Sequence, residues 1–287
     1  MPASMNHAVG LGELAALAAP LERLYARYNH ARFVEPDPLQ CLGPYEDVAD
    51  REVVGMVASG LAFGNVRTIL RSTGAVLEKM PRPARFLDGV TRRRLDALFT
   101  GFRHRFVTGS DVANMLWGIK RARRRHGTLE GLFAHCMRAE DETILPALAR
   151  FSSELRGGRA NYLLPEIDKG SACKRLHLYL RWMVRRDAVD PGGWSCVTPA
   201  QLLMPMDTHS HRIARLLGLT RRNAADARAM LEVTTAFRKL RPDDPVRYDF
   251  CLTRLGIRTD TDLDGFVRAC RMAASRAARP PNWRNEQ

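Results

Sequence analysis

Residues Met204-Pro-Met-Asp-Thr-His-Ser-His-Arg-Ile-Ala-Arg-Leu-Leu-Gly-Leu219 place a carboxylate directly before a short amphipathic helix. Asp207 has the residue type and position of an N-cap, whose oxygens accept hydrogen bonds from the free N–H groups two and three residues on. The pattern predicts a buried side made of Ile213, Ala214, Leu216 and Leu217. It predicts an exposed basic side made of His209, His211, Arg212 and Arg215, and a helix end at Gly218. Asp207 is therefore either a plain helix cap or a carboxylate that the helix start presents for chemistry.

The chain carries a formal net charge of +14 and a pI near 10.2, and arginine supplies nearly all of its basic side chains. Basic clusters recur along it, at residues 92–94, 120–125, 185–186 and 221–222. Such a field favours a polyanionic partner, and nucleic acid is the commonest one. The alternative is a genome rich in G and C, which raises the arginine content of any protein surface. No basic stretch is paired with a strongly apolar face, which argues against a membrane partner.

A chain of 287 residues can hold one large domain or two small ones, and its 45% hydrophobic content is ordinary for a globular protein. No segment approaches the ~18 to 20 uninterrupted apolar residues of a membrane span. The first residues show no basic region followed by a long apolar run, which is the pattern of a secretion signal. The six cysteines, at 41, 136, 173, 196, 251 and 270, show no C-x-x-C spacing, which argues against a zinc ribbon or an iron–sulfur loop. We therefore expect a cytoplasmic protein with free thiols, no metal and no cofactor.

Helix-period patterns recur along nearly the whole chain, whereas alternating β-branched runs are absent. The spacing of leucines predicts a first helix over 11–28. Asp50 is a candidate cap for a helix that ends near Phe63. Further helices are predicted over 66–78, 91–100, 111–124, 128–138 and 142–155. The predicted class is therefore all-α, with a frayed tail over 276–287.

The segment 174–186 fits two templates. Its residues Leu176, Leu178, Leu180 and Trp182 alternate, which is typical of a strand. A helix fits better, because it gathers most apolar side chains on one side and leaves a basic stripe of Lys174, His177, Arg181 and Arg185. Such a helix either lines a cleft or is a core helix whose arginines reach solvent.

The pattern P-x-D-T-H-x-x-R-I-A-R-x-L-G-L over residues 205–219 resembles the helix-hairpin-helix DNA glycosylase superfamily. In that family an aspartate at this point serves base excision. A lysine upstream begins the second helix of the hairpin, usually within L-P-G-V-G-x-K. The matching text is Leu164-Pro-Glu-Ile-Asp-Lys-Gly-Ser-Ala-Cys-Lys174, which keeps the leucine and proline and lacks the glycine-x-glycine turn. The gap from Lys174 to Asp207 is close to that in archaeal 8-oxoguanine glycosylases, with an inserted loop over 187–205.

Other parts of the chain agree with this resemblance. Residues 51–63 look like the early family helix that precedes the pocket, and residues 245–252 look like a late family helix. The whole chain also resembles an uncharacterised conserved bacterial family with a K-R-L-x-x-x-L-R-W-M-V-R segment, here residues 174–185. The resemblance implies an all-α, two-lobed fold with a cleft between the lobes. One lobe would span 45–186, and the other would join 1–44 to 187–287.

The resemblance also implies a DNA glycosylase that excises a damaged base flipped into this cleft, with or without AP lyase activity. With lyase activity, the Lys174 amine is the nucleophile that attacks the sugar C1′. Asp207 then orients the amine and stabilises the positive charge that develops on the sugar. Lys169, in the loop before the helix, is the rival nucleophile. Without lyase activity only Asp207 is needed, to hold or activate a water molecule.

Residues around this pair are the expected contacts with a damaged DNA duplex: Lys169, Gly170, Ser171, Arg175, Arg181, His209 and Arg212. The turn Lys169-Gly170-Ser171 is a candidate phosphate-binding nest in place of the missing glycines. Three aromatic residues are candidates to stack on a base or to belong to the core, namely Phe63, Trp182 and Trp194. The runner-up hypothesis is a non-catalytic nucleic-acid-binding protein that keeps the glycosylase fold. We expect a monomer, and the sequence does not name the excised base.

Overall fold

The structure is a computed structural model that describes residues 10–278 of the chain. Helices make up most of it, as the sequence predicts: α1 (Leu11–Ala16), α2 (Ala18–Tyr28), α3 (Val48–Gly60), α4 (Val66–Leu77), α5 (Pro83–Gly89), α6 (Arg92–Leu98), α7 (Gly109–His126), α8 (Leu129–Cys136), α9 (Leu145–Arg156), α10 (Lys174–Val184), α11 (Thr208–Leu216), α12 (Ala227–Leu240), α13 (Asp249–Ile257) and α14 (Leu263–Ala277). Short 3₁₀ turns add η1 (Ala31–Phe33), η2 (Pro38–Leu42), η3 (Ile167–Lys169) and η4 (Pro199–Gln201). A small hairpin pairs β1 (Arg103–His104) with β2 (Val107–Thr108). Within the described residues, no helix combines the length and apolar character needed to cross a bilayer.

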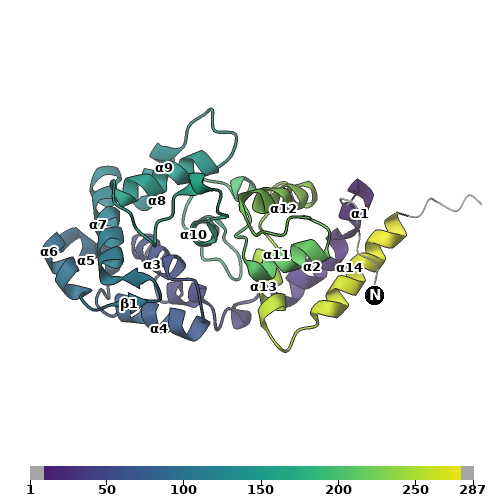
Figure 1. The fold of residues 1–287 in the computed structure, drawn as a ribbon, viewed down its shortest axis with the longest axis horizontal. Helices are drawn as coiled ribbons and strands as arrows, with labels where there is room; N and C mark the ends of the chain where they lie inside the picture. Colours follow the sequence, from purple (N-terminus) through teal and green to yellow (C-terminus); the bar gives the residue numbers. More distant parts are fainter. Residues whose placement is uncertain (1–9, 279–287) are drawn as a thin grey trace, which may run out of the picture.

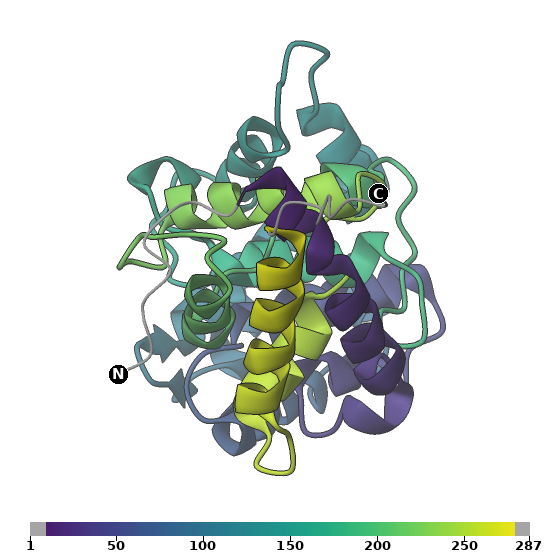
Figure 2. The same ribbon diagram turned by 90° about the vertical axis from the view of Figure 1, so that its right-hand side faces the viewer.

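The helices gather in two groups with α10 between them (Figure 1). In one group, α3 to α9, helix α7 packs against α6, α8 and α9, and α3 packs against α4 and α5. The terminal group joins α1 and α2 to α11–α14, and Figure 2 shows α14 alongside α1 and α2. Helix α10 packs against α3. The segment η2 lies within residues 1–44, which the family resemblance places in the terminal lobe, and it packs against α3 and α4. The terminal group is therefore assembled from both ends of the chain.

One helix expected from the sequence is two helices in the structure. The segment 11–28 divides into α1 and α2, with Leu17 between them. Pro20 explains the division, because a proline ring collides with the carbonyl group four residues earlier, which here belongs to Ala16. The leucines of both helices still face the core: Leu14, Leu17, Leu21 and Leu24 are buried.

The start of α3 also differs from the expectation. Asp47 is the N-cap, and its Oδ1 accepts the Ala49 N–H at 2.9 Å. Asp50, the predicted cap, lies in the first turn. Its Oδ1 accepts the Ala84 N–H at 2.7 Å, which fastens α3 to the start of α5. Residue type identifies both aspartates as capping candidates, and in the structure Asp47 caps α3 while Asp50 binds the start of α5.

A buried glutamate in α3 holds distant segments together. Glu52 is 0% exposed, and its carboxylate accepts the N–H groups of Leu129 and Glu130 at 2.9 and 2.8 Å. It also accepts the indole N–H of Trp194 at 2.8 Å. The Trp194 backbone N–H in turn donates to the Met183 carbonyl at 2.8 Å. Glu52 therefore ties the start of α8 and the inserted loop to α3, close to the end of α10.

The C-terminal end of helix α14 also differs from the prediction made from the sequence. The predicted tail over 276–287 begins inside the last turn of α14, because Arg276 and Ala277 are helical. Residues 279–287 lie outside the described part of the chain.

Candidate active site

A cleft of about 1280 Å³ is lined by residues of both helix groups. One side comes from the connection between α3 and α4 and from α4 itself. The other comes from the start of α11, from α13 and residues 258–260 after it, and from residues 36–38, while α10 contributes residues between Lys174 and Trp182. Lys174 and Asp207 both line this cleft.

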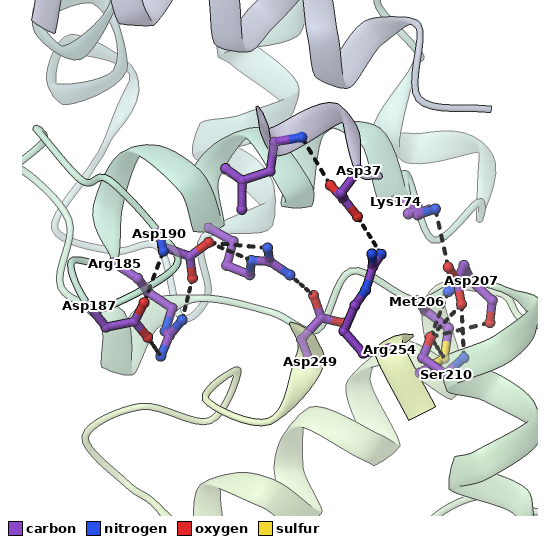
Figure 3. A network of polar contacts seen from close by, with 12 residues as sticks. Asp37, Lys174, Arg185, Asp187, Asp190, Met206, Asp207, Ser210, Asp249 and Arg254 are labelled. Atoms are coloured by element: carbon purple, nitrogen blue, oxygen red, sulfur yellow. Dashed lines mark hydrogen bonds and ion pairs between the residues drawn. The ribbon is translucent and has the colours of Figure 1, made fainter. Parts of the chain in front are cut away.

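Asp207 caps α11, as its residue type predicts. Its Oδ1 accepts the N–H groups of His209 and Ser210 at 2.9 and 2.8 Å. Ser210 completes a capping box, because its Oγ accepts the Asp207 N–H at 2.8 Å. These contacts fix the carboxylate and leave Oδ2 to face Lys174 (Figure 3).

Lys174 is the first residue of α10, and its Nζ lies 3.2 Å from Asp207 Oδ2 (Figure 3). The side chain of Lys174 is 31% exposed and that of Asp207 is 12% exposed, so the pair is shielded but open to the cleft. Cys173, the N-cap of α10, has a φ of 42°, which is uncommon for a residue other than glycine. The chain therefore turns sharply, at some conformational cost, directly before Lys174.

The surroundings of Asp207 favour its charged form. Burial alone would raise the pKa of Asp207, but the Lys174 ammonium and the hydrogen bonds of Ser210 outweigh burial and hold this pKa below its ordinary value of 3.8. Asp207 is therefore ionised at neutral pH. An ionised carboxylate is what the stabilisation of a positively charged transition state requires.

A second carboxylate, Asp249, also lines the cleft, and the sequence analysis did not single it out. It is the first residue of α13, is 1% exposed and pairs with Arg181. Burial raises the pKa of Asp249 to about 6 against the opposing effect of Arg181, and the charge of Asp207 adds to the rise. Its Oδ1 is a buried acceptor without a hydrogen-bond partner in the described part of the chain. The cleft thus holds two carboxylates whose pKa values are pushed apart, which is typical of active sites.

Arg181 belongs to a buried network of ion pairs behind Asp249. It also pairs with Asp190 at 3.1 Å, and Asp190 pairs with Arg185. Arg185 reaches Asp244 at 3.0 Å. Both arginines are 3% exposed, so these two members of the predicted basic stripe lie inside the protein, where carboxylates neutralise them. Arg181, which the sequence indicated as a DNA contact, has its guanidinium committed to this network.

The other predicted site residues divide into two sets. Those that line the cleft are Ser171, Arg175 and His209. Three exposed residues are not among the described residues that line it, namely Lys169, Gly170 and Arg212. The side chain of Lys169 is 74% exposed, and its Nζ pairs with Glu166 at 2.8 Å, so the rival nucleophile lies outside the cleft. His211, predicted on the exposed side of α11, is buried, with Nε2 3.0 Å from the Arg222 carbonyl oxygen.

The three candidate stacking residues differ in burial and in whether they line the cleft. Trp194 is a core residue, 5% exposed, with its ring 5.6 Å from that of Phe133. Trp182 is 1% exposed and contributes to the cleft lining. Phe63 is half-buried and lines the cleft as well. Phe63 therefore has the most accessible ring of the three on the cleft side.

Residues 37–258 match the family model described as "Protein of unknown function (DUF2400)". The match contains Lys174, Asp207, Asp249 and Arg181, so it includes the chemistry of the cleft. No curated protein and no solved structure matches the chain.

Proposed function

We propose that this chain, which belongs to the DUF2400 family, is a DNA glycosylase that excises a damaged base and then acts as an AP lyase through Lys174. One observation carries the proposal: Lys174 Nζ lies 3.2 Å from Asp207 Oδ2 at the wall of a cleft. A lysine and an aspartate in one cleft are the pair that the resemblance to helix-hairpin-helix glycosylases implies. The proposal includes their fold, in which two lobes enclose the extruded base.

The lysine content of the chain strengthens the choice of nucleophile. A Schiff base requires a primary amine, which a guanidinium cannot supply. Five of the 45 basic residues are lysines, and Lys174 is the one lysine among the described residues that line the cleft. A basic surface made almost entirely of arginine can hold phosphates. The chemistry needs this single amine.

The proposed reaction assigns a step to each side chain. The Lys174 amine attacks C1′ of the extruded nucleoside, and the glycosidic C–N bond breaks as the new C–N bond forms. The base leaves with the bonding electron pair and takes up the proton that the Lys174 ammonium releases. The sugar ring then opens to a Schiff base, and loss of a proton from C2′ expels the 3′ phosphate. Asp207 stays ionised, and its Oδ2, 3.2 Å from Nζ, is placed to orient the amine and to stabilise the developing positive charge.

The proposal takes a damaged DNA duplex as the partner of a monomeric cytoplasmic protein. The formal net charge of +14 supports a polyanionic partner. His209 and Arg212 are exposed on α11, the helix that Asp207 caps, where a DNA backbone could lie across the cleft mouth. With ~6 phosphate contacts, affinity should fall roughly a thousandfold between 50 and 200 mM salt.

A second candidate, a non-catalytic nucleic-acid-binding protein, is favoured by the loop before α10. In place of the glycine-x-glycine turn, the loop carries Glu166, which pairs with Lys169 and Arg156 at 2.8 Å each. A carboxylate here competes with a DNA phosphate for both cations. This weakens the hairpin as a DNA clamp, but it does not alter the Lys174 and Asp207 pair.

Borohydride trapping on a panel of damaged and abasic-site duplexes tests the proposal. The wild type should form a covalent complex with at least one substrate, because borohydride reduces a Schiff base to a stable amine. Lys174→Gln should form none while still binding an abasic-site duplex. Lys169→Gln is the matched control, since it removes the other lysine near α10, and it should trap normally. Full trapping by Lys174→Gln would refute the assignment of the nucleophile, and no trapping by the wild type on any substrate would favour the second candidate.

A further inference from the structure

Arg175 directly follows Lys174 at the start of α10, and its guanidinium is bound to the protein on two sides. Nη1 donates to the Gly60 carbonyl at 2.7 Å, and Nη2 donates to the Tyr162 carbonyl at 2.6 Å. Both acceptors are backbone groups, so these contacts fix the course of the chain as well as the side chain. Arg175 therefore joins the first turn of α10 to the end of α3 and to the segment that precedes α10.

Gly60 is the last residue of α3 and offers a carbonyl that suits a cation. The last four carbonyls of a helix have no partner within the helix, and the helix dipole makes this end negative. Helix α10 also packs against α3 (Figure 1). The Arg175 guanidinium thus fastens the start of one helix to the end of its neighbour, at a point where positive charge is favoured.

Two aromatic rings restrict the same guanidinium further. Its central carbon lies 5.0 Å from the ring centroid of Phe63 and 5.2 Å from that of Tyr162. A planar guanidinium stacks on aromatic faces, which an ammonium group does less well. Burial lowers the pKa of Arg175 from its ordinary value of 12.5, but an arginine side chain keeps its charge in a protein. Two carbonyls and two rings therefore hold Arg175 in one orientation.

The start of α10 benefits from such a support. Its N-cap, Cys173, is not one of the residue types that usually cap a helix, and it adopts a φ of 42°. Lys174 follows it and extends its amine to 3.2 Å from Oδ2 of Asp207, which belongs to the terminal helix group (Figure 3). A misplacement of about 1 Å in a reacting group can lower a rate about 100-fold. The position of the first turn of α10 therefore decides whether the pair can form.

We propose that Arg175 is a positioning residue, whose bonds to two carbonyls fix the first turn of α10 and keep the Lys174 amine beside Asp207. The consequence for the reaction rate rests on the proposed function, whereas the consequence for the geometry of the pair does not. A contact with a DNA phosphate is the other use of an arginine that lines the cleft. The geometry favours positioning, because both Nη groups already donate to carbonyls, at 2.7 and 2.6 Å.

The first measurement uses the full chain without DNA. Reductive methylation with isotope-labelled formaldehyde gives each lysine amine an NMR signal and keeps its charge, and the signal of Lys174 is the one that Lys174→Gln lacks. Asp207→Asn should move this signal, because the amine loses the carboxylate beside it. In protein that also carries Arg175→Lys, Asp207→Asn should move the signal by about half as much or less. The reason is that a single ammonium group lacks the fork that reaches both carbonyls.

The second measurement compares the rate of borohydride trapping at saturating protein with the affinity for a duplex that carries a tetrahydrofuran abasic-site analogue. Arg175→Lys should trap about 10- to 100-fold more slowly than the wild type, while its affinity stays within about threefold. Arg175→Met keeps the packing against the rings and removes both donors, and it should show the same split between rate and affinity.

Arg51→Lys is the matched control for both measurements. Arg51 also donates to backbone carbonyls, those of Gly192 and Glu46 at 2.8 and 3.1 Å, and it is not among the described residues that line the cleft. The control should trap at the wild-type rate, and its Lys174 signal should respond fully to Asp207→Asn. A loss of general stability would lower both variants alike, whereas a loss of positioning is confined to Arg175.

The possible outcomes separate this inference from the proposed function. Normal trapping by Arg175→Lys, with a full response of the Lys174 signal, would overturn the inference and leave the glycosylase proposal standing. A loss of affinity as large as the loss of rate would also overturn it and assign Arg175 to a DNA phosphate. Equal defects in Arg51→Lys would overturn it in favour of general stability. A wild type that traps no substrate would refute the lyase, and the NMR measurement would then decide the inference by itself.

Discussion

Replacing Asp207 with asparagine separates the two uses of this side chain. Oδ1 accepts the N–H groups of His209 and Ser210 at 2.9 and 2.8 Å, while Oδ2 lies 3.2 Å from Lys174 Nζ. Asparagine caps a helix about as well as aspartate, so the capping contribution of roughly 1 kcal/mol is kept. The variant therefore removes the negative charge beside Lys174 and little else.

The exposure of the pair sets the expected cost in stability. A hydrogen bond to a charged group contributes about 1.5–3 kcal/mol, whereas an exposed ion pair contributes about 0–1 kcal/mol. The Lys174 side chain is 31% exposed, so water replaces part of the lost interaction with its ammonium. We expect Asp207→Asn to lower the free energy of unfolding by about 1 kcal/mol, which corresponds to roughly 2–4 °C in Tm for a chain of this size.

Base release on a damaged duplex should respond far more strongly. Removing a group that stabilises charge in a transition state costs about 10²- to 10³-fold in rate, and single-turnover kinetics at saturating protein measures this step. Asp262→Asn is the matched control, since Asp262 caps α14 with its Oδ1 2.7 Å from the Gly265 N–H. The control should excise at the wild-type rate. Excision at that same rate by folded Asp207→Asn would show that Asp207 is a plain helix cap and would refute its catalytic role.

Two further predictions concern stability. Glu52→Gln should lower the free energy of unfolding by about 2–4 kcal/mol. The two carboxylate oxygens accept hydrogen bonds from Leu129, Glu130 and Trp194, and the single amide oxygen of glutamine cannot accept all three. A melting temperature within about 1 °C of the wild type would contradict this prediction. The pKa of Asp207 is held below 3.8 in the folded state, so its contribution to stability is present above that pH and is lost as the pH falls through the lower folded value. The stability difference between the wild type and Asp207→Asn should therefore shrink below about pH 4, and a difference that stays constant down to acid unfolding would contradict the ion pair.

The fold class follows from the sequence because helix periodicity is local. The leucine spacing of 11–28 correctly identifies the buried side, and Pro20, read with its steric effect on Ala16, also explains the break in that helix. Helix α12 also has a local signal in the sequence, because Met230, Val233 and Phe237 repeat at helical spacing and are buried. The hairpin of β1 and β2 has no such signal in the sequence. Its strands are two residues each, and Arg105 stands at a turn position where glycine or asparagine is preferred.

The candidate site was predictable only where it is local. Asp207 precedes a recognisable helix, and Lys174 begins one, so each could be singled out from its own surroundings. Asp249 could not, because it reaches the cleft through the packing of α13 against α11 and through its pairing with Arg181. The pairing of Arg181 with Asp190 and Asp249 inside the protein was equally hidden from the sequence. A basic stripe on a helix looks alike whether its partners are phosphates outside the protein or carboxylates inside it, and only the tertiary structure distinguishes them.

Two interpretations of Asp207, a helix cap and a reactive carboxylate, are compatible because they use different oxygens. The cap occupies Oδ1, and Ser210 locks the carboxylate by donating to Oδ1 at 3.0 Å while accepting the Asp207 N–H at 2.8 Å. These two hydrogen bonds restrict rotation of the carboxylate and leave Oδ2 facing Lys174. Preorganisation of this kind is what electrostatic catalysis requires, since no energy is then spent on reorienting the group during the reaction. The helix start thus serves the proposed chemistry through the same hydrogen bonds by which it stabilises α11.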